Sequence, residues 1–216
     1  MPIRTTRDPR GACRRIVARC FAGLVALPIF SDAAGPEPAR FATMKSDLAQ
    51  RSPDIRWPNG FSPPAAELFA HNERLVDAPC DIVWRFLVDA TRWPQWYSNA
   101  RDVRLVDSAQ PVLKEGAVFR WTTFGLSIES RVDEFVPNAR LGWYGYAPGT
   151  PPSFHHAWLL VPKTGGCEVV TEEAGIGRDA AALRSKDEGL MHRGHDLWLA
   201  SLRWAAENAA AQGGTR

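Results

Sequence analysis

The chain has 216 residues, with 26 Lys and Arg against 24 Asp and Glu, nine tryptophans and four cysteines. This length is enough for one domain with a sizeable core and an additional segment. Six of the arginines lie in residues 1–33, which leaves 20 basic residues of 26 and 22 acidic residues of 24 for the rest. The body of the protein therefore lacks the basic surplus of nucleic-acid-binding proteins, and its many tryptophans argue against disorder.

Residues 1–33 have the pattern of a signal or leader segment. An arginine-rich start leads into the apolar run CFAGLVALPIF, and the small residues of SDA suit a secretory cleavage site. The apolar run is too short to span a bilayer, so we expect no transmembrane span in the mature chain. An exported protein would be periplasmic. The alternatives are a disordered tail, or a cytoplasmic protein whose translation starts at Met44.

Residues 34–70 are rich in Pro, Ala and Ser and predict an N-terminal arm, which ends in a short helix over 63–70 with Ser62 as its cap. A strand is expected over 72–79. The segment CDIVWRFLVDA then has apolar residues at helical spacing. Pro94 and its neighbours predict a turn or a second short helix.

Six runs of alternating character, separated by turn signals, predict further strands. They are 101–106, 117–123, 126–136, 140–146, 154–161 and 167–174. In LSIESRVDEF the polar positions alternate with the others, so one face of the sheet is expected to be wet, as in an antiparallel sheet covered on one side. A long helix is expected at about 180–210, followed by a flexible tail at 212–216. This order predicts an α+β domain over 71–211, in which one curved antiparallel sheet packs around the long helix.

Several stretches together resemble the START/Bet v 1-like (SRPBCC) superfamily, and more narrowly its polyketide cyclase/dehydrase and lipid-transport group. They include ERLVDAPCDIVWRFLVDATRWPQWYSNARDV, VDEFVPNARLGW and LWLASLRWAAENA, and the resemblance covers roughly residues 70–210. It implies a helix-grip fold of about seven strands, with two short helices after the first strand and a deep apolar cavity between the sheet and the C-terminal helix. It implies no single reaction, because members include cyclases, lipid carriers, hormone receptors and chaperone-associated domains.

The four cysteines form no C-x-x-C pattern, so their spacing gives no sign of a zinc or iron–sulfur site. Cys13 and Cys20 lie in the leader. If the resemblance holds, the strand that ends before Cys80 pairs with the strand that Cys167 opens. A disulfide between Cys80 and Cys167 would then be within reach, and the periplasm would permit it.

The candidate cavity residues are mostly aromatic side chains of the helical corner and inward-facing positions of the strands. Trp93 is expected in the core, whereas Trp96 and Tyr97 belong either to the core or to the cavity. Ser130 either bonds a ligand or satisfies a backbone group. The candidate ligand-binding residues are Trp96, Tyr97, Phe119, Trp121, Ile128, Ser130, Trp143, His156, Trp158, Leu190, Gly194 and Leu197.

One face of the long helix is expected to contact the sheet. Its members are Leu183, Leu190, Gly194, Leu197, Ser201 and Trp204. Gly194 either leaves room for a ligand or allows close packing of helix on sheet. His192 and His195 fall outside this face, so we expect them in solvent and expect no metal site formed with Glu188.

His155 and His156 are adjacent on a strand and therefore point to opposite faces of the sheet. His156 is the preferred inward residue, because it shares its face with bulky apolar neighbours. An inward histidine could act as a general acid or base, or it could anchor a ligand or satisfy the core. Glu172 or Glu173 could orient it, and the pattern does not decide which.

The leading hypothesis is a binding module that holds a small hydrophobic or amphipathic molecule in an aromatic cavity, as a carrier, sensor or sequestering protein. The alternative is a cyclase or dehydratase that uses the same cavity, with His156 as its candidate catalytic residue. A second alternative is a protein-interaction domain of the co-chaperone kind. The chain has no nucleotide fingerprint, and we expect no cofactor.

Overall fold

The computed structural model describes residues 42–106 and 111–213, which belong to a single unit. The leader predicted at 1–33 lies outside these residues, as do Cys13 and Cys20. Seven strands form one antiparallel sheet in the order β1-β7-β6-β5-β4-β3-β2. They are β1 (Leu68–Val76), β2 (Arg101–Val106), β3 (Val118–Thr123), β4 (Leu126–Val136), β5 (Arg140–Tyr146), β6 (Phe154–Lys163) and β7 (Gly166–Gly175). The sheet and the helices around it confirm the predicted α+β helix-grip fold.

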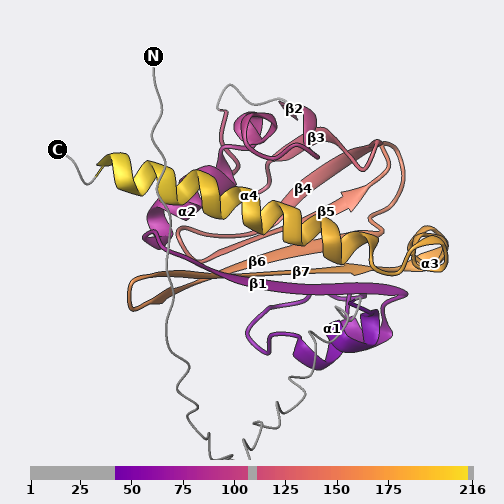
Figure 1. Ribbon diagram of the computed structural model, residues 1–216. Helices are drawn as coiled ribbons and strands as arrows, with labels where there is room; N and C mark the ends of the chain where they lie inside the picture. Colours follow the sequence, from indigo (N-terminus) through magenta and orange to yellow (C-terminus); the bar gives the residue numbers. More distant parts are fainter. Residues whose placement is uncertain (1–41, 107–110, 214–216) are drawn as a thin grey trace, which may run out of the picture. The chain divides into compact units, whose positions relative to one another are not determined.

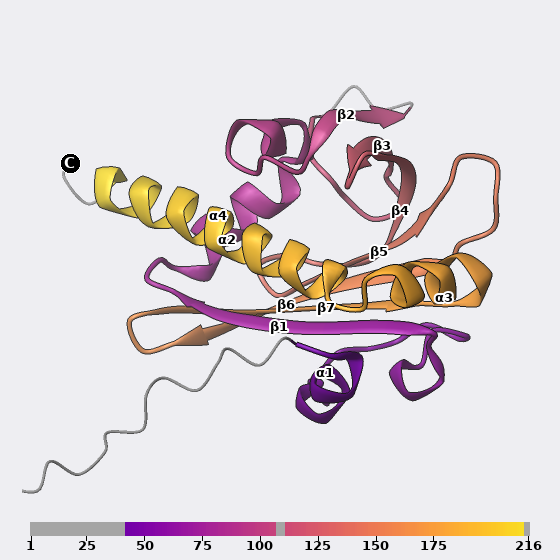
Figure 2. The ribbon, with the colours of Figure 1, turned by 45° about the vertical axis from the view of Figure 1, so that its right-hand side comes forward.

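Helices cover both faces of the sheet. The described helices are α1 (Met44–Gln50), η1 (Pro63–Ala65), α2 (Cys80–Val88), η2 (Ala90–Gln95), α3 (Gly177–Lys186) and α4 (Leu190–Gly213). The long helix α4 crosses the concave face, while α1 lies on the other side of β1 (Figures 1 and 2). In the part of the chain that the structure describes, no helix is long and apolar enough to cross a bilayer.

The C-terminal helical region differs from the single helix predicted at about 180–210. It consists of α3 and α4, because Asp187 takes an extended conformation that ends α3. The flexible tail was expected from residue 212, but α4 continues to Gly213. The remaining residues of that tail lie outside the described range.

The buried face of α4 is also not the predicted one. Its buried residues are Met191, Gly194, His195, Trp198, Leu199, Leu202, Ala205 and Ala206. Gly194 is buried as predicted, but Leu197 is 45% exposed and Trp204 67% exposed, so the C-terminal part of the predicted stripe was wrong. The helix carries large apolar residues on more than one side, and the side that packs contains Trp198, Leu199 and Leu202.

The core is centred on Trp93, which is fully buried, as expected. Four aromatic rings surround it with centroid separations of 5.1–5.8 Å: Phe119, Trp121, Trp143 and Trp198. The indole N–H of Trp93 donates to the carbonyl oxygen of Leu87 at 3.1 Å, so the buried polar atom is satisfied.

A disulfide joins Cys80, the first residue of α2, to Cys167 in β7, with their Cα atoms 5.0 Å apart. Cys167 lies opposite Val76 in the β1–β7 register. The end of β1 therefore meets the start of β7, which is the pairing that the family resemblance implied. The bond ties the helical layer on the concave side to the edge region of the sheet.

The outer face of the sheet is not wet over β1, β6 and β7, contrary to the prediction from β4. The segment before β1 packs on it, and its Trp57 and Phe61 contact the ring of His155, which is only 1% exposed. This cover also explains β1, which begins at Leu68. Its first five residues are all buried, so they show no alternation, and the sequence suggested a helix over 63–70 instead.

Candidate ligand cavity with a histidine–glutamate cluster

A cavity of about 210 Å³ lies between the concave face of the sheet and helices α3 and α4. Its inner wall is formed by buried aromatic rings, chiefly Trp121, Trp143 and Trp198. Phe124 and Leu126 also line it and are partly exposed, at 41% and 56%. The cavity therefore opens to solvent near the β3–β4 turn and has an aromatic interior.

Tyr97 closes one side of the cavity next to this turn. Burial, the largest influence, raises the pKa of Tyr97 to about 12, so its hydroxyl stays protonated at physiological pH. The hydroxyl lies 3.4 Å from the carbonyl oxygen of Gly194, to which it donates, and it accepts from the side-chain amide of Asn99. Asn99 also accepts from the backbone N–H of Phe124, so it fixes the turn at the mouth.

Phe124 lies over Gly194 at this mouth. A Cβ atom at residue 194 would overlap the edge of the Phe124 ring, so the glycine allows this close approach. Of the two alternatives for Gly194, the structure supports close packing rather than space for a ligand. The partner is the β3–β4 turn, whose residue Phe124 has a positive φ of 51°.

Ser130 is fully buried and contributes to the cavity wall. Its hydroxyl oxygen accepts from the indole N–H of Trp121 at 3.1 Å. The hydroxyl therefore satisfies a tryptophan rather than a backbone group, and its own proton can still be donated to a ligand.

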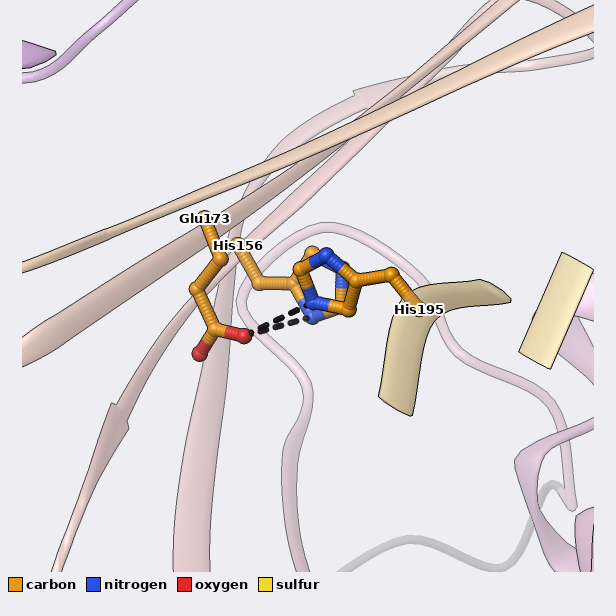
Figure 3. Close-up of side chains that lie close together, drawn as sticks. All are labelled: His156, Glu173 and His195. Atoms are coloured by element: carbon orange, nitrogen blue, oxygen red, sulfur yellow. Dashed lines mark hydrogen bonds and ion pairs between the residues drawn. The ribbon is translucent and has the colours of Figure 1, made fainter. Parts of the chain in front are cut away.

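Among the residues that line the cavity, two histidines and a glutamate come together from three elements (Figure 3). Nε2 of His195 in α4 lies 3.1 Å from Oε2 of Glu173 in β7, and Nδ1 of His156 in β6 lies 3.7 Å from the same oxygen. The two imidazole rings stack with centroids 4.7 Å apart. The cluster exists because His156 and Glu173 are opposite each other in the β6–β7 register, with α4 above them.

The remaining ring nitrogens also have partners. Nε2 of His156 lies 2.7 Å from the hydroxyl of Thr171, and Nδ1 of His195 lies 3.2 Å from the side-chain oxygen of Asn72. Complete burial, followed by the nearby His195 and His155, lowers the pKa of His156 well below its usual value. His156 is therefore a neutral imidazole at the end of an apolar cavity, within reach of a carboxylate.

The structure brings seven of the twelve predicted ligand-binding residues to the cavity. They are Tyr97, Trp121, Ile128, Ser130, Trp143, His156 and Leu190. Phe119 and Trp158 are buried in the core beside it, and Trp96 lines a separate surface hollow with Phe86. Gly194 is covered by Phe124, and Leu197 is exposed.

Sequence reasoning missed His195 and Trp198, and it named Glu173 only as one of two glutamates that could orient His156. His195 was expected in solvent and is 3% exposed, so that prediction was wrong. A helical stripe through Met191, His195, Trp198 and Leu202 would have placed it correctly. A polar residue in the middle of this stripe is the signal that was available.

The chain belongs to the polyketide cyclase/dehydrase and lipid transport family, whose model matches residues 70–194. Among solved structures, a hypothetical protein from Helicobacter pylori is 29% identical and aligns over 72% of this chain and 98% of its own, with a TM-score of 0.66. The Zhui aromatase/cyclase from Streptomyces sp. R1128 is 17% identical over 64% of this chain and 93% of its own, with a TM-score of 0.52. A protein from Nitrosomonas europaea is 19% identical over 68% and 98%, with a TM-score of 0.53. No curated protein matches the chain.

Proposed function

We propose that the protein binds a small hydrophobic or amphipathic molecule in the aromatic cavity and acts as a carrier, sensor or sequestering protein. The observation that carries this proposal is the cavity itself. Its lining is mostly apolar and includes three tryptophans, and His156, Glu173 and His195 gather on its wall. Apolar walls with a few convergent polar groups are the usual form of a small-molecule site. A cavity of this kind weighs against the protein-interaction alternative.

The volume supports a compact ligand. The cavity of about 210 Å³ is larger than an engineered cavity of about 150 Å³ that takes up benzene. It is smaller than the pockets of roughly 300–1,000 Å³ that hold drug-sized molecules. A molecule of one or two rings, or a short chain, fits these limits.

The test is to fill the cavity without disturbing the fold. A Cβ atom at Gly145 would meet Phe154 and Ile128 at 3.6 and 3.8 Å, which is ordinary contact, so Gly145→Val is expected to fold and to reduce the cavity. Ser127→Val is the control, because Ser127 is exposed on the adjacent strand β4. Binding of β-naphthol is measured by energy transfer from the cavity tryptophans, and native mass spectrometry identifies any molecule that co-purifies.

We expect Gly145→Val to weaken β-naphthol binding by about tenfold or more, which is the effect of losing about 1.4 kcal/mol of contacts, and to lose any co-purifying molecule. Ser127→Val is expected to match the unaltered protein. Equal binding by Gly145→Val and Ser127→Val, both folded, would remove the support for a ligand in this cavity.

The second candidate function is a cyclase or dehydratase, and the histidine–glutamate cluster favours it. A neutral His156 can accept a proton, and the polar end of the cavity is where such a transfer would take place. The Zhui aromatase/cyclase shares the fold. If a dehydration occurs here, Glu173→Gln protein should retain a bound molecule heavier by one water than the molecule bound by the unaltered protein. Identical bound masses would count against this candidate.

We also propose that the protein works in an oxidising compartment. The Cys80–Cys167 disulfide supports this, because such bonds persist mainly in secreted and periplasmic proteins. In protein isolated from its own cells, thiol labelling of these two cysteines should require prior reduction, and the mature N-terminus should lie near residue 33. Free thiols, or an N-terminus at Met1 or Met44, would contradict the proposal.

A further inference from the structure

The histidine–glutamate cluster has the donors of a metal site. His156, Glu173 and His195 each offer one ligand atom, and these atoms lie within 4.8 Å of one another. We propose that the three residues bind one divalent transition-metal ion, with a remaining coordination position directed into the cavity. Two imidazoles and one carboxylate suit Zn²⁺ or Fe²⁺, and three protein ligands with an open position are typical of reactive rather than structural metal sites.

The three donor atoms lie within 4.8 Å of one another, so binding one ion requires them to move closer together. Metal–nitrogen and metal–oxygen bonds of about 2.0–2.2 Å place the donors of one ion roughly 3–3.5 Å apart. The His195–Glu173 contact, at 3.1 Å, is already in this range. The His156–Glu173 contact, at 3.7 Å, has to close by a few tenths of an ångström.

Hydrogen bonds around the cluster determine where the proton sits on His156. The hydroxyl of Thr171 donates to the carbonyl oxygen of Ala157 at 3.3 Å. Its oxygen therefore accepts from Nε2 of His156, 2.7 Å away. The proton of a neutral His156 is then on Nε2, and the Nδ1 lone pair faces Glu173. This assignment follows from the network of hydrogen bonds.

The same argument applies to His195. The side-chain amide nitrogen of Asn72 donates to the carbonyl oxygen of His192 at 3.1 Å and to Asp196 at 3.0 Å. The side-chain oxygen of Asn72 is left to accept from Nδ1 of His195. Nε2 of His195 is thus the nitrogen directed at Glu173. Thr171 and Asn72 hold the rings as the outer hydrogen-bond partners of metal-binding histidines do.

Two imidazole lone pairs, on His156 Nδ1 and His195 Nε2, consequently lie close to the same carboxylate oxygen, Glu173 Oε2. They repel one another unless a cation lies between them. A proton on His195 would satisfy the His195–Glu173 contact alone and would leave His156 facing a carboxylate oxygen. A metal ion accepts electron pairs from all three.

The free coordination position of the ion indicates which chemical class of molecule would bind in the cavity. This step rests on the proposed function. A molecule bound among Trp121, Trp143 and Trp198 would reach the ion with one end. An apolar body that carries a carboxylate, a phenolate or an enolised ketone fits both parts of the site. These groups supply the oxygen donors that a divalent ion accepts.

The experiment uses the full chain without a polyhistidine tag, freed of metal by a chelator. Co²⁺ is added, its visible d–d absorption is recorded, and Zn²⁺ is then used to displace it. We expect one equivalent to bind, and we expect Glu173→Gln and His195→Gln to weaken binding by more than about 100-fold. Thr171→Val, which removes only a partner of His156, should weaken it by about 10–100-fold.

The control is His192→Gln. His192 also contacts two carboxylates, Asp47 and Asp196, but lies outside the cluster, so its loss should leave Co²⁺ binding unchanged. Circular dichroism verifies that each variant is folded. The proposal is overturned if the unaltered protein shows no Co²⁺ absorption beyond that of Glu173→Gln, or if His192→Gln weakens binding as much as His195→Gln does. β-naphthol binding to the metal-free protein tests the proposed function separately, so one can fail while the other stands.

Discussion

Both faces of the β6–β7 part of the sheet carry a histidine and a glutamate, but the two pairs have different roles. His155 and Glu172 point outward, whereas their neighbours His156 and Glu173 point into the cavity. On the outer face, His155 bonds Asp133 at 3.0 Å, and His71 bonds Glu172 at 2.7 Å. The comparison shows that access to a cavity, rather than residue type, separates a structural pair from a candidate functional one.

The outer and inner carboxylates also differ in how deeply they are buried. The side chains of His71 and Glu172 are 4% and 0% exposed, and Glu172 also accepts from the backbone N–H of Ser52 in the covering segment. Glu173 is 20% exposed and contributes to the cavity wall. The outer pair therefore holds the sheet to its cover, whereas the inner carboxylate can meet water, a metal ion or a ligand.

The largest expected effect comes from breaking the outer pair. His71→Leu leaves the charge of Glu172 buried without its partner, which should cost about 3–5 kcal/mol of unfolding free energy. The matched inner variant, His195→Leu, should cost only about 1–3 kcal/mol, because the cavity still gives Glu173 access to water. Urea unfolding measures both. A loss in His195→Leu as large as that in His71→Leu would remove the distinction between the faces.

A second prediction concerns how the helical layers on the two faces are attached to the sheet. On the concave side, the disulfide between Cys80 and Cys167 ties α2 to the sheet across 87 residues of sequence. The outer cover, residues 42–67, contains no cysteine, so beyond its main-chain connection to β1 no disulfide ties it to the sheet. Replacing both cysteines by alanine should lower the unfolding free energy by about 2–4 kcal/mol, mainly because the unfolded chain is freed.

The free energy of unfolding is measured by urea titration for the double variant and for the unaltered protein, the latter with and without reductant. The reduced protein should approach the double variant. Unchanged stability after verified reduction would mean that packing alone holds α2 in place. Limited proteolysis of residues 42–67 should be the same in both forms, because the disulfide lies in the other layer.

The sequence was sufficient for the sheet because β2 to β7 alternate or are bounded by turn residues. For β1 it was only partly sufficient: a strand was expected over 72–79, but β1 begins at Leu68, because burial on both faces removes the alternation from its first five residues. The outer cover was unforeseen for a related reason. Trp57 and Phe61 lie in a segment rich in proline, and no periodic pattern shows that they pack on His155.

The candidate site was only partly predictable because its cluster depends on contacts between distant elements. His156 was identified from strand alternation, which is a local signal. Its pairing with Glu173 needs the β6–β7 register, and the approach of His195 needs the rotation of α4 about its axis. The spacing of Leu190, Leu197 and Trp204 suggested the wrong rotation, because large apolar residues occur on more than one side of α4 and the packed side also contains His195.

The smallest expected effect is at the contact between α4 and α1, where His192 in α4 forms a hydrogen bond with Asp47 in α1 at 3.1 Å. The hydrogen bond that His192 donates to the carboxylate of Asp47, the largest influence, raises the pKa of His192, and the charges of Asp47 and Asp196 act in the same direction. Burial and Arg193 oppose this rise. Because the folded protein binds this proton more tightly than the unfolded chain does, the contact stabilises the folded state most when His192 is charged.

This contribution should be complete below the unfolded pKa of about 6.5 and should disappear as the pH rises through the higher folded value. At pH values near 6 we expect it to be about 1 kcal/mol or less, since the pair is partly exposed. A double-mutant cycle of His192→Gln and Asp47→Asn isolates the coupling between the two side chains. The coupling should fall towards zero at alkaline pH, and a coupling that grows with pH would show that the neutral form of His192 makes the favourable contact.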